Sequence, residues 1–324
     1  MRAIVVKSWL KNPSDMEVRD VPAPIPMEGE LLVRIDSAGA NFFDILMVQG
    51  KYQFKPLFPF TPGAEFSGTV VRVADSVNST QFKVGDRIFG SNPTGAYAEY
   101  IAVPALQCFH IPSTLSFEQA AGSLVLRAQV MPGDWVLVHA AAGGVGIAAV
   151  QIAKALGARV IAAVGSASKF DVCWAQGADH CINYREPDWT NKVLDLTDGM
   201  GANVVFDPVG LVEKSLKCVA WNGRVVIVGF AAGSIEKISA NRILLKNVAV
   251  TGVHWGAYVL NEPERIPEVW DALFKMAEER KINPVVYTPV YHGLESVKNA
   301  LKAIANRETY GKVVVKPSVI SSKL

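Results

Sequence analysis

Residues 136–155 read VLVHAAAGGVGIAAVQIAKA, and this stretch decides the fold. An apolar run breaks into small residues and resumes with the spacing of a helix, which we expect over 145–156. Gly144, Gly146 and Ala149 match the pattern G-x-G-x-x-G/A, in which one glycine permits a sharp turn and another lets the backbone approach a diphosphate. A tight turn that binds nothing is the alternative, but the strand before the glycines and the helix start after them favour a dinucleotide site. The residues expected to contact the cofactor here are Ala142, Gly143, Gly144, Val145 and Gly146.

The end of the second expected strand indicates which dinucleotide binds. A protein that prefers NAD needs a carboxylate about twenty residues after the glycines, where it holds the 2′-hydroxyl of the ribose. The segment from Val164 to Lys169 reads VGSASK and contains no carboxylate. Ser166 and Lys169 suit a 2′-phosphate instead, and Tyr184 and Arg185, after the third strand, are further candidates. We therefore expect NADPH; a solvated lysine at a helix start is the alternative interpretation of Lys169.

Strand and helix patterns alternate from about Trp135 onward. This alternation predicts a parallel sheet with helices on both faces, and six strands fit the dinucleotide-binding architecture. The expected strands are WVLVH, ARVIAAV, HCIN, ANVVFD, GRVVIVG and NVAVTGVHW, and the expected helices cover 145–156, 168–176, 212–220 and 264–281.

The first third of the chain is rich in short β-type runs. AIVV, LLVRI, FSGTVVRV, DRIFG and AEYIAV are separated by turns with Pro and Gly, which predicts compact, partly barrel-like β structure. Near the end, VVYTPV and KVVVK are expected strands with SVKNALKAIA as a helix between them. We expect this tail to fold back onto the first third. The chain is thus predicted to hold two domains, residues 1–122 completed by 283–324, and residues 123–282 inserted between those segments.

Composition excludes several classes of partner. Half of the 324 residues are hydrophobic and 19% are charged, a globular balance long enough for two domains. The 32 basic and 30 acidic residues give a net charge of +2. So small a charge produces no electrostatic field that would attract nucleic acid or a membrane surface. No apolar run reaches the roughly 18 residues of a membrane span. The four cysteines form no C-x-x-C pair and no zinc spacing, so we expect reduced, mostly structural thiols.

The last three residues are Ser322, Lys323 and Leu324. A terminal S-K-L is the signal that the peroxisomal import receptor reads. We therefore expect a peroxisomal protein that binds this receptor, and otherwise a cytoplasmic one; a chance tripeptide is the alternative.

The stretch GDWVLVHAAAGGVGIAAVQIAK, residues 133–154, closely resembles the signature of the zinc-free, NADPH-dependent quinone oxidoreductases. These form the zeta-crystallin-like branch of the medium-chain dehydrogenase/reductase superfamily. GANFFDIL, PGAEFSGTV, VGDRIFG, GAYAEY and a final GKVVV extend the resemblance over nearly the whole chain. It implies an α/β fold: a GroES-like, partly β-barrel catalytic domain with an inserted Rossmann doubly wound parallel sheet, and a cleft between the two. It also implies a homodimer that pairs through the sixth strand, near Val248–Val253.

The resemblance implies hydride transfer from NADPH to a quinone or quinone-like acceptor. Reduction of an activated C=C bond in enals or enones is the enzymatic alternative, because the same hydride geometry serves both. Asn41, Asp44 and Tyr52 are implied to line the cleft, where Asn41 would hydrogen-bond the ribose or the substrate carbonyl and Tyr52 would stack on a flat ring. A turn residue at Asn41 and a core residue at Tyr52 are the ordinary alternatives. Further cofactor contacts are implied for Gly229, Phe230, Gly311 and Lys312.

The residues at the positions of the zinc ligands in zinc-dependent relatives argue against a zinc site. Zinc-dependent relatives carry G-H-E where this chain has Gly63, Ala64 and Glu65, and GANFFDIL lacks the cysteine ligand. Glu65 is interpreted as a buried, hydrogen-bonded acid, and His139 as a packing residue. A quinone is electrophilic enough to accept hydride without a Lewis acid.

One segment departs from the family. We expect a helix over 116–126 with Ser116 as its N-cap. Only four residues separate Gly122 from Arg127, where the family has a longer connection. The shortening removes an expected contact with the nicotinamide. A nucleotide-binding protein with impaired catalysis is therefore the alternative from another class.

Overall fold

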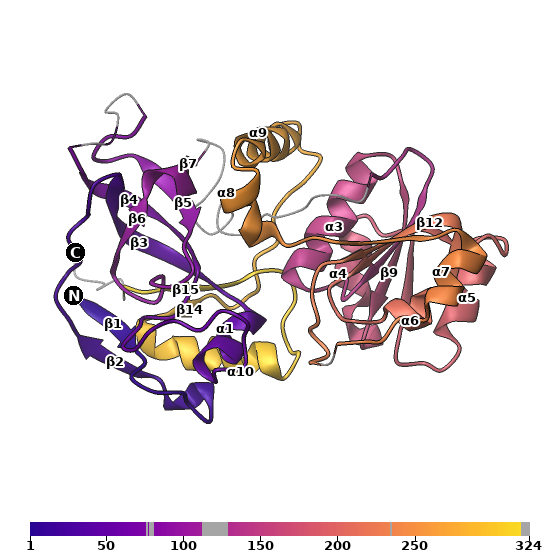
Figure 1. Ribbon diagram of the computed structural model, residues 1–324, viewed down its shortest axis with the longest axis horizontal. Coiled ribbons are helices and arrows are strands. Elements are labelled where there is room, and N and C mark those ends of the chain that lie inside the picture. Colours follow the sequence, from indigo (N-terminus) through magenta and orange to yellow (C-terminus); the bar gives the residue numbers. More distant parts are fainter. Residues whose placement is uncertain (76, 78–80, 112–128, 234, 319–324) are drawn as a thin grey trace. The chain divides into compact units, whose positions relative to one another are not determined.

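The computed structural model describes residues 1–75, 77, 81–111, 129–233 and 235–318. The chain divides into two compact units (Figure 1). Unit 1 comprises Met1–Gly122 and Pro284–Leu324, and unit 2 comprises Ser123–Asn283. The expected helix over 116–126, the short connection after Gly122 and the expected import signal at Ser322–Leu324 lie outside the described residues.

Unit 2 contains a six-stranded, wholly parallel sheet in the order β10-β9-β8-β11-β12-β13. This is the order of a Rossmann fold, with a reversal between β8 and β11. The central strands are continuous apolar runs with both faces covered, and all five residues of β8 are buried. The predicted doubly wound parallel sheet is confirmed. The strands are β8 Trp135–His139, β9 Arg159–Val164, β10 His180–Asn183, β11 Ala202–Asp207, β12 Val219–Ile227 and β13 Ala249–Gly252.

Helices cover both faces of this sheet. In Figure 1, α3 and α4 lie on one face, and α5 and α6 lie on the other. Apolar side chains from α5, α6 and the strands form one buried cluster, which includes Leu137, Ile161, Trp189, Val205 and Leu216. The helices are α3 Gly144–Ala155, η3 Ala167–Lys169, α4 Phe170–Ala175, α5 Trp189–Leu196, α6 Val212–Ser215, α7 Ala240–Lys246, η4 Trp255–Ala257, α8 Tyr258–Asn261 and α9 Arg265–Glu278.

The expected helix over 212–220 is wrong in its second half. Helix α6 ends at Ser215, and β12 begins at Val219, which pairs with Ala202 of β11. The apolar residues at the end of the expected helix are buried in the strand ladder instead. A short apolar run fits a strand or a helix equally well by its pattern, so the pairing partner decides. Helix α7 was not predicted, because none of its residues is fully buried, although Ile243 packs against the cluster of unit 2.

Unit 1 is built on a mixed sheet in the order β14-β15-β3-β4-β5-β7, with β6 also paired to β3, and on a two-stranded sheet of β1 and β2. The predicted β-rich character of the first third is confirmed. The strands are β1 Arg2–Val5, β2 Glu17–Asp20, β3 Glu30–Ala40, β4 Glu65–Val73, β5 Arg87–Ser91, β6 Tyr100–Pro104, β7 Cys108–His110, β14 Tyr291–His292 and β15 Val313–Lys316. The helices are η1 Pro13–Asp15, α1 Phe42–Val48, η2 Ala105–Gln107, η5 Leu294–Ser296 and α10 Val297–Ala305.

The tail folds back onto the first third, as predicted. Strand β15 pairs antiparallel with β3, so that Val313 lies opposite Ala40 and Val315 opposite Ala38. The expected strand VVYTPV is wrong: Val286 forms a single bridge with Lys312, and the strand begins only at Tyr291. Prolines flank and interrupt that segment, and each removes an N–H group that a ladder needs.

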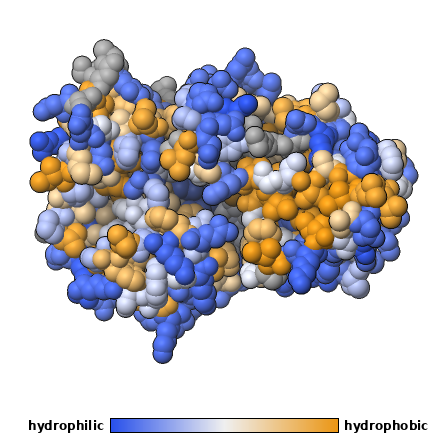
Figure 2. Space-filling model, viewed as in Figure 1, coloured by the Kyte–Doolittle hydropathy of each residue, from blue (hydrophilic) through white to orange (hydrophobic). Residues whose placement is uncertain are grey.

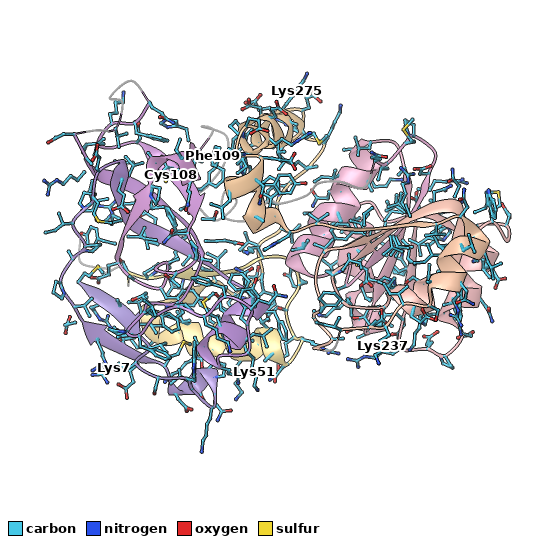
Figure 3. All side chains as sticks on the ribbon, in the orientation of Figure 1. Lys7, Lys51, Cys108, Phe109, Lys237 and Lys275 are labelled. Carbon is cyan, nitrogen blue, oxygen red and sulfur yellow. The ribbon has the colours of Figure 1, made fainter. Side chains whose placement is uncertain are left out.

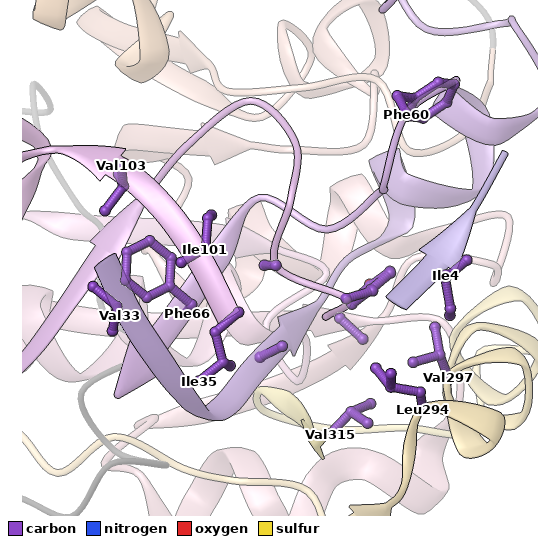
Figure 4. Close-up of a cluster of buried hydrophobic side chains, with 14 of the residues drawn as sticks. Ile4, Val33, Ile35, Phe60, Phe66, Ile101, Val103, Leu294, Val297 and Val315 are labelled. Carbon is purple, nitrogen blue, oxygen red and sulfur yellow. The ribbon is translucent and has the colours of Figure 1, made fainter. Parts of the chain in front are cut away.

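One apolar core holds unit 1 together (Figure 4). Phe66 of β4 lies among Val33 and Ile35 of β3, while Leu294 and Val297 face Val315 of the tail. This core joins β3, β4, β15 and α10, and the loop after β3 leads directly into α1. The end of β3, the start of β4 and the start of β15 are thereby held beside one another.

Candidate functional site

The glycine loop of unit 2 has the geometry that its pattern predicts. Strand β8 ends at His139, Gly143 is the N-cap of α3, and its N–H donates to the carbonyl of Ala140 at 2.8 Å. A Cβ at Gly146 would stand 2.2 Å from that same carbonyl oxygen, so the turn admits only glycine there. The N–H groups of the first turn of α3 have no partner within the helix, because no earlier turn exists.

This loop lies at the point where the strand order of the sheet reverses. β8 and β11 are neighbours, and in open parallel sheets ligands bind beyond the carboxyl ends of the strands at such a reversal. Asp207, the last residue of β11, is fully buried. Its carboxylate accepts three backbone N–H groups, from Val209 at 2.8 Å, Gly210 at 2.9 Å and Leu211 at 2.6 Å. Sequence reasoning missed this acid, which holds the loop after β11 in place.

The residues expected at the ribose phosphate meet at the ends of β9 and β10. Asn183 of β10 lies opposite Val164 of β9, so the segment after one strand adjoins the segment after the other. A Cβ at Gly165 would stand 3.1 Å from the Tyr184 hydroxyl and 3.3 Å from Nε of Arg185. The hydroxyls of Ser166 and Ser168 are 2.8 Å apart, next to Lys169, which ends η3.

The loop after β12 reaches the same edge of the sheet. A Cβ at Gly229 would meet the carbonyl oxygen of Pro208 at 3.4 Å, and Ala231 donates its N–H to that oxygen at 3.0 Å. Phe230 lies between these two positions. The predicted contacts Gly229 and Phe230 therefore lie beside the loop that Asp207 organises.

Asn41 and Asp44 form the start of helix α1 in unit 1. Asn41 is the N-cap, and its N–H donates to Oδ2 of Asp44 at 2.9 Å. The spacing N-x-x-D is that of a capping box, which was a readable signal. Asp44 is fully buried, and the hydroxyl of Tyr97 donates to the same Oδ2 at 2.7 Å. Tyr97, from the GAYAEY segment, is a partner that sequence reasoning missed.

Lys312 joins this start of α1 to strand β4. Its Nζ donates to Oδ1 of Asn41 at 2.7 Å and forms an ion pair with Glu65. The two charged side chains are mostly buried, with exposed fractions of 11% for Lys312 and 19% for Glu65. A Cβ at Gly39 would stand 2.7 Å from Oε2 of Glu65 and 2.8 Å from Cε of Lys312, so glycine makes room for the pair. Gly311 has a positive φ of 56° and packs against the carbonyl of Val285, which places Lys312.

The ammonium group of Lys312 settles the orientation of the Asn41 amide. An ammonium group only donates, so the Asn41 atom facing it must be the carbonyl oxygen. The amide nitrogen Nδ2 then points away, and it is buried with no acceptor among the described residues. A buried donor without a partner is rare in native proteins. The arrangement therefore offers N–H groups to an acceptor oxygen of a ligand.

Burial raises the pKa of Asp44 from 3.8 to about 7, although the hydrogen bonds from Tyr97 and from the Asn41 N–H partly oppose this rise. Because the folded-state value lies above the unfolded one, protonated Asp44 stabilises the fold below about pH 4, and this contribution disappears as the pH rises to about 7. Asp44→Asn removes the titration. The stability of this variant relative to wild type should increase by about 4 kcal/mol from pH 4 to pH 8. Urea unfolding of both proteins over this range measures the difference, and parallel curves would contradict the raised pKa.

Tyr52 lies at the margin of the core of unit 1. Its ring is half-buried and is 5.5 Å from the ring of Phe43, at an interplanar angle of 32°. Burial raises the pKa of its hydroxyl, with a smaller contribution from Asp44. One side of the ring therefore has a packing role, and stacking on a ligand stays a prediction.

His139 is fully buried in unit 2 and has the contacts of a packing residue. Ser215 donates its hydroxyl to the carbonyl of Leu211 at 2.7 Å, so His139 Nε2 donates to that hydroxyl at 2.8 Å. Burial lowers the pKa of the imidazole to about 4, and its ring stands edge-on to Trp189. A neutral imidazole fixed in this way has a structural role.

Among the described residues, no three His, Cys, Asp or Glu side chains gather as they would around a metal ion. No helix in that part of the chain is both long and apolar enough to cross a membrane.

Comparison with known proteins agrees with this geometry. Residues 27–113 match the model of the alcohol dehydrogenase GroES-like domain, and residues 144–275 match that of the zinc-binding dehydrogenases. A quinone oxidoreductase-like protein 2 homolog of Nematostella vectensis is 39% identical over 300 residues, 88% of this chain and 81% of that protein. The quinone oxidoreductase-like protein 2 of Mus musculus is 34% identical over 320 residues, 94% of this chain and 89% of its own.

A solved structure matches over almost the entire length. The crystal structure of Escherichia coli quinone oxidoreductase complexed with NADPH superposes with a TM-score of 0.90 at 30% identity, covering 98% of this chain and all of that one. The glycine loop, the strand order and these relatives lead to one conclusion: the chain belongs to the quinone oxidoreductase branch of the medium-chain dehydrogenase/reductase superfamily.

Proposed function

We propose that this protein is an NADPH-dependent oxidoreductase that reduces quinones or quinone-like acceptors without zinc. The observation that carries the cofactor assignment is the cluster at the ends of β9 and β10. There the hydroxyl of Tyr184 and the guanidinium of Arg185 adjoin Gly165, and no carboxylate stands between Val164 and Lys169. A 2′-phosphate suits this donor set, whereas the 2′-hydroxyl of NAD would call for an acid.

NADPH supplies the hydride when it is bound. The residues of the chain bind and orient: the first turn of α3 holds the diphosphate, and Ser166, Lys169, Tyr184 and Arg185 hold the 2′-phosphate. Asn41 presents its Nδ2 donor to an oxygen of the acceptor or of the cofactor ribose. A carbonyl oxygen becomes negative as hydride arrives at a quinone, so a fixed donor stabilises the transition state more than the ground state.

Zinc independence is supported by the ion pair at Glu65. The ammonium group of Lys312 already lies against the carboxylate of Glu65, and a zinc cation at the same carboxylate would be repelled by it. We expect turnover to survive prolonged treatment with a chelator. The purified active enzyme should contain less than one zinc ion per ten chains by elemental analysis, on the order expected of adventitious metal. Loss of activity on chelation, restored by zinc, would contradict this proposal.

The acceptor class is tested by comparing a quinone with a 2-alkenal in steady-state assays of NADPH oxidation. We expect the higher kcat/KM for the quinone. A far higher value for the alkenal would replace quinone reduction by reduction of activated C=C bonds. NADPH binding without oxidation by either acceptor would identify a nucleotide-binding protein with impaired catalysis.

Arg185→Ala should weaken NADPH binding by about tenfold to a hundredfold and leave NADH binding almost unchanged, because a charge-assisted contact with the 2′-phosphate is lost. Arg159→Ala is the matched control, since Arg159 begins β9, away from the strand ends where Arg185 lies, and is 4.2 Å above the ring of Trp135. Quenching of tryptophan fluorescence by each nucleotide gives the dissociation constants. Equal weakening for NADPH and NADH would remove Arg185 from the phosphate site.

A homodimer through the outer edge of the unit 2 sheet completes the proposal. Strand β13 has β12 as its neighbour, with its other edge unpaired among the described strands. Helix α7 exposes Leu244 and Leu245 by 79% and 71%, and a hydrophobic area is visible over unit 2 in Figure 2. Large exposed apolar patches mark interaction surfaces. Sedimentation should give twice the chain mass for wild type and a lower mass for Leu244→Glu; a wild-type monomer at micromolar concentration would refute the dimer.

A further inference from the structure

Two of the four cysteines adjoin each other in unit 2. Cys173 lies in α4, and Cys181 lies in β10. The turn between them is tight, because Gly177 has a positive φ of 97° and the N–H of Ala178 donates to the carbonyl of Cys173 at 3.1 Å. The chain therefore returns directly from the end of α4 into β10.

The alternation of β10 directs Cys181 toward α4. Ile182 packs into the cluster formed with α5, so Cys181, its neighbour in the strand, faces the opposite side of the sheet. The thiol of Cys181 is 3.7 Å from the carbonyl oxygen of Phe170, in the first turn of α4. Cys173 stands one turn further along the same helix, and the two thiols are hydrogen-bond partners.

The two thiols differ in their exposure and in the direction in which their pKa is shifted. The hydrogen bond from Cys173 lowers the pKa of the Cys181 thiol, and burial only partly opposes this. The same hydrogen bond, together with burial, raises the pKa of Cys173. Cys181 is half-buried, whereas Cys173 is fully buried. A thiolate is the nucleophile in thiol chemistry, so Cys181 is the thiol that reacts first, with a protonated partner beside it.

We propose that Cys173 and Cys181 form an oxidation site that hydrogen peroxide converts to an intramolecular disulfide. The thiolate of Cys181 attacks one peroxide oxygen and breaks the O–O bond, which gives a sulfenic acid at Cys181 and hydroxide. The sulfur of Cys173 then attacks the sulfenic sulfur, the S–O bond breaks, and the oxygen leaves as water with the proton of Cys173. The two thiols lose two electrons in total, and one peroxide molecule gains them.

The position of this pair gives the bond a structural consequence. Helix α4 follows Ser166 and Lys169, and β10 precedes Tyr184 and Arg185. A disulfide would covalently join the two elements that carry the proposed 2′-phosphate residues. The modification itself does not rest on the proposed function, and its test uses no turnover.

The sequence makes the test direct, because both cysteines fall in one tryptic peptide, Phe170–Arg185. The native full-length protein is treated with stoichiometric hydrogen peroxide, denatured in iodoacetamide and digested. We expect this peptide to be lighter by two hydrogen atoms and unalkylated, and to become doubly alkylated after dithiothreitol. A peptide that stays doubly alkylated after peroxide treatment overturns the proposal.

The other cysteines and two variants supply the controls. Burial raises the pKa of Cys108, which lies in β7 next to Phe109 (Figure 3), and that of Cys218 to about 12 each, so both should remain reduced. Cys173→Ser should stop at a sulfenic acid on Cys181, trapped by dimedone, and Cys181→Ser should leave Cys173 unoxidised. Oxidation of Cys108 and Cys218 at the same rate would show unselective reaction and would count against the pair.

Discussion

Lys312→Met is expected to lower the free energy of unfolding by about 3–5 kcal/mol, because it leaves the carboxylate of Glu65 mostly buried without its counter-charge. The double variant Glu65→Gln with Lys312→Met should regain most of this stability, since a neutral amide costs less to bury than a charge. Urea unfolding of the two variants and of wild type measures the recovery. A stable single variant would show that the ion pair is solvated.

Activity should not recover together with stability. Without the ammonium group, nothing holds Oδ1 of Asn41, and its amide loses the orientation that presents Nδ2. We expect kcat/KM for a quinone to fall about a hundredfold in both Lys312 variants, the lower end of the effect of losing one oriented donor. Asn41→Ala should cause a similar loss, and combining it with Lys312→Met should add little, because both changes remove the same interaction. Full recovery of kcat/KM in the double variant would assign Lys312 a structural role alone.

Gly146→Ala is expected to abolish measurable NADPH binding, a loss of more than about a hundredfold in affinity. The added Cβ would stand 2.2 Å from the carbonyl oxygen of Ala140 and 2.8 Å from Cα of Ala141. Both are backbone atoms, so no side-chain rotation can relieve the clash. The first turn of α3 must therefore move away from the loop. The N–H groups that face the diphosphate move with it.

Gly256→Ala is the matched control for this variant, because a Cβ there meets no atom of the described chain within 4 Å. Fluorescence quenching by NADPH measures affinity, and circular dichroism with thermal unfolding separates lost binding from lost folding. A folded Gly146→Ala protein that binds NADPH within about threefold of wild type would contradict the close-approach role of this glycine.

The sheet of unit 2 could be predicted because its central strands and its glycine turn are recognisable from short, continuous segments of sequence. The central strands β8, β9 and β11 are largely apolar runs, and the glycines stand directly between a strand and a helix. Helix α3 begins at Gly144, one residue before its predicted start. Where the local pattern was ambiguous, as over 212–220, the pairing of Val219 with Ala202 decided for a strand. The sequence pattern of one segment does not show which other segment it pairs with.

The polar cluster of unit 1 could be predicted only in part. The pair Asn41 and Asp44 has a local signal in its capping-box spacing. Their partners Tyr97 and Lys312 come from segments that are 53 and 271 positions away along the chain. Such contacts depend on the pairing of β15 with β3 and on the loop that brings Tyr97 inward. Sequence alone suggested Lys312 as a cofactor contact but not as the residue that orients Asn41.

The pairing of β15 with β3 also has a consequence for biosynthesis. Ala38 and Gly39 pair with β4 on one side, but Ala38–Ala40 obtain their partner on the other side only from Val313–Val315, whereas unit 2 is complete by Asn283. A domain folds as a unit once its residues have left the ribosome, and N-terminal segments wait for distant partners. We therefore expect the nucleotide-binding fold to form on the nascent chain while the first 122 residues are still unfinished. The lysine that orients Asn41 is added only after unit 2 is complete.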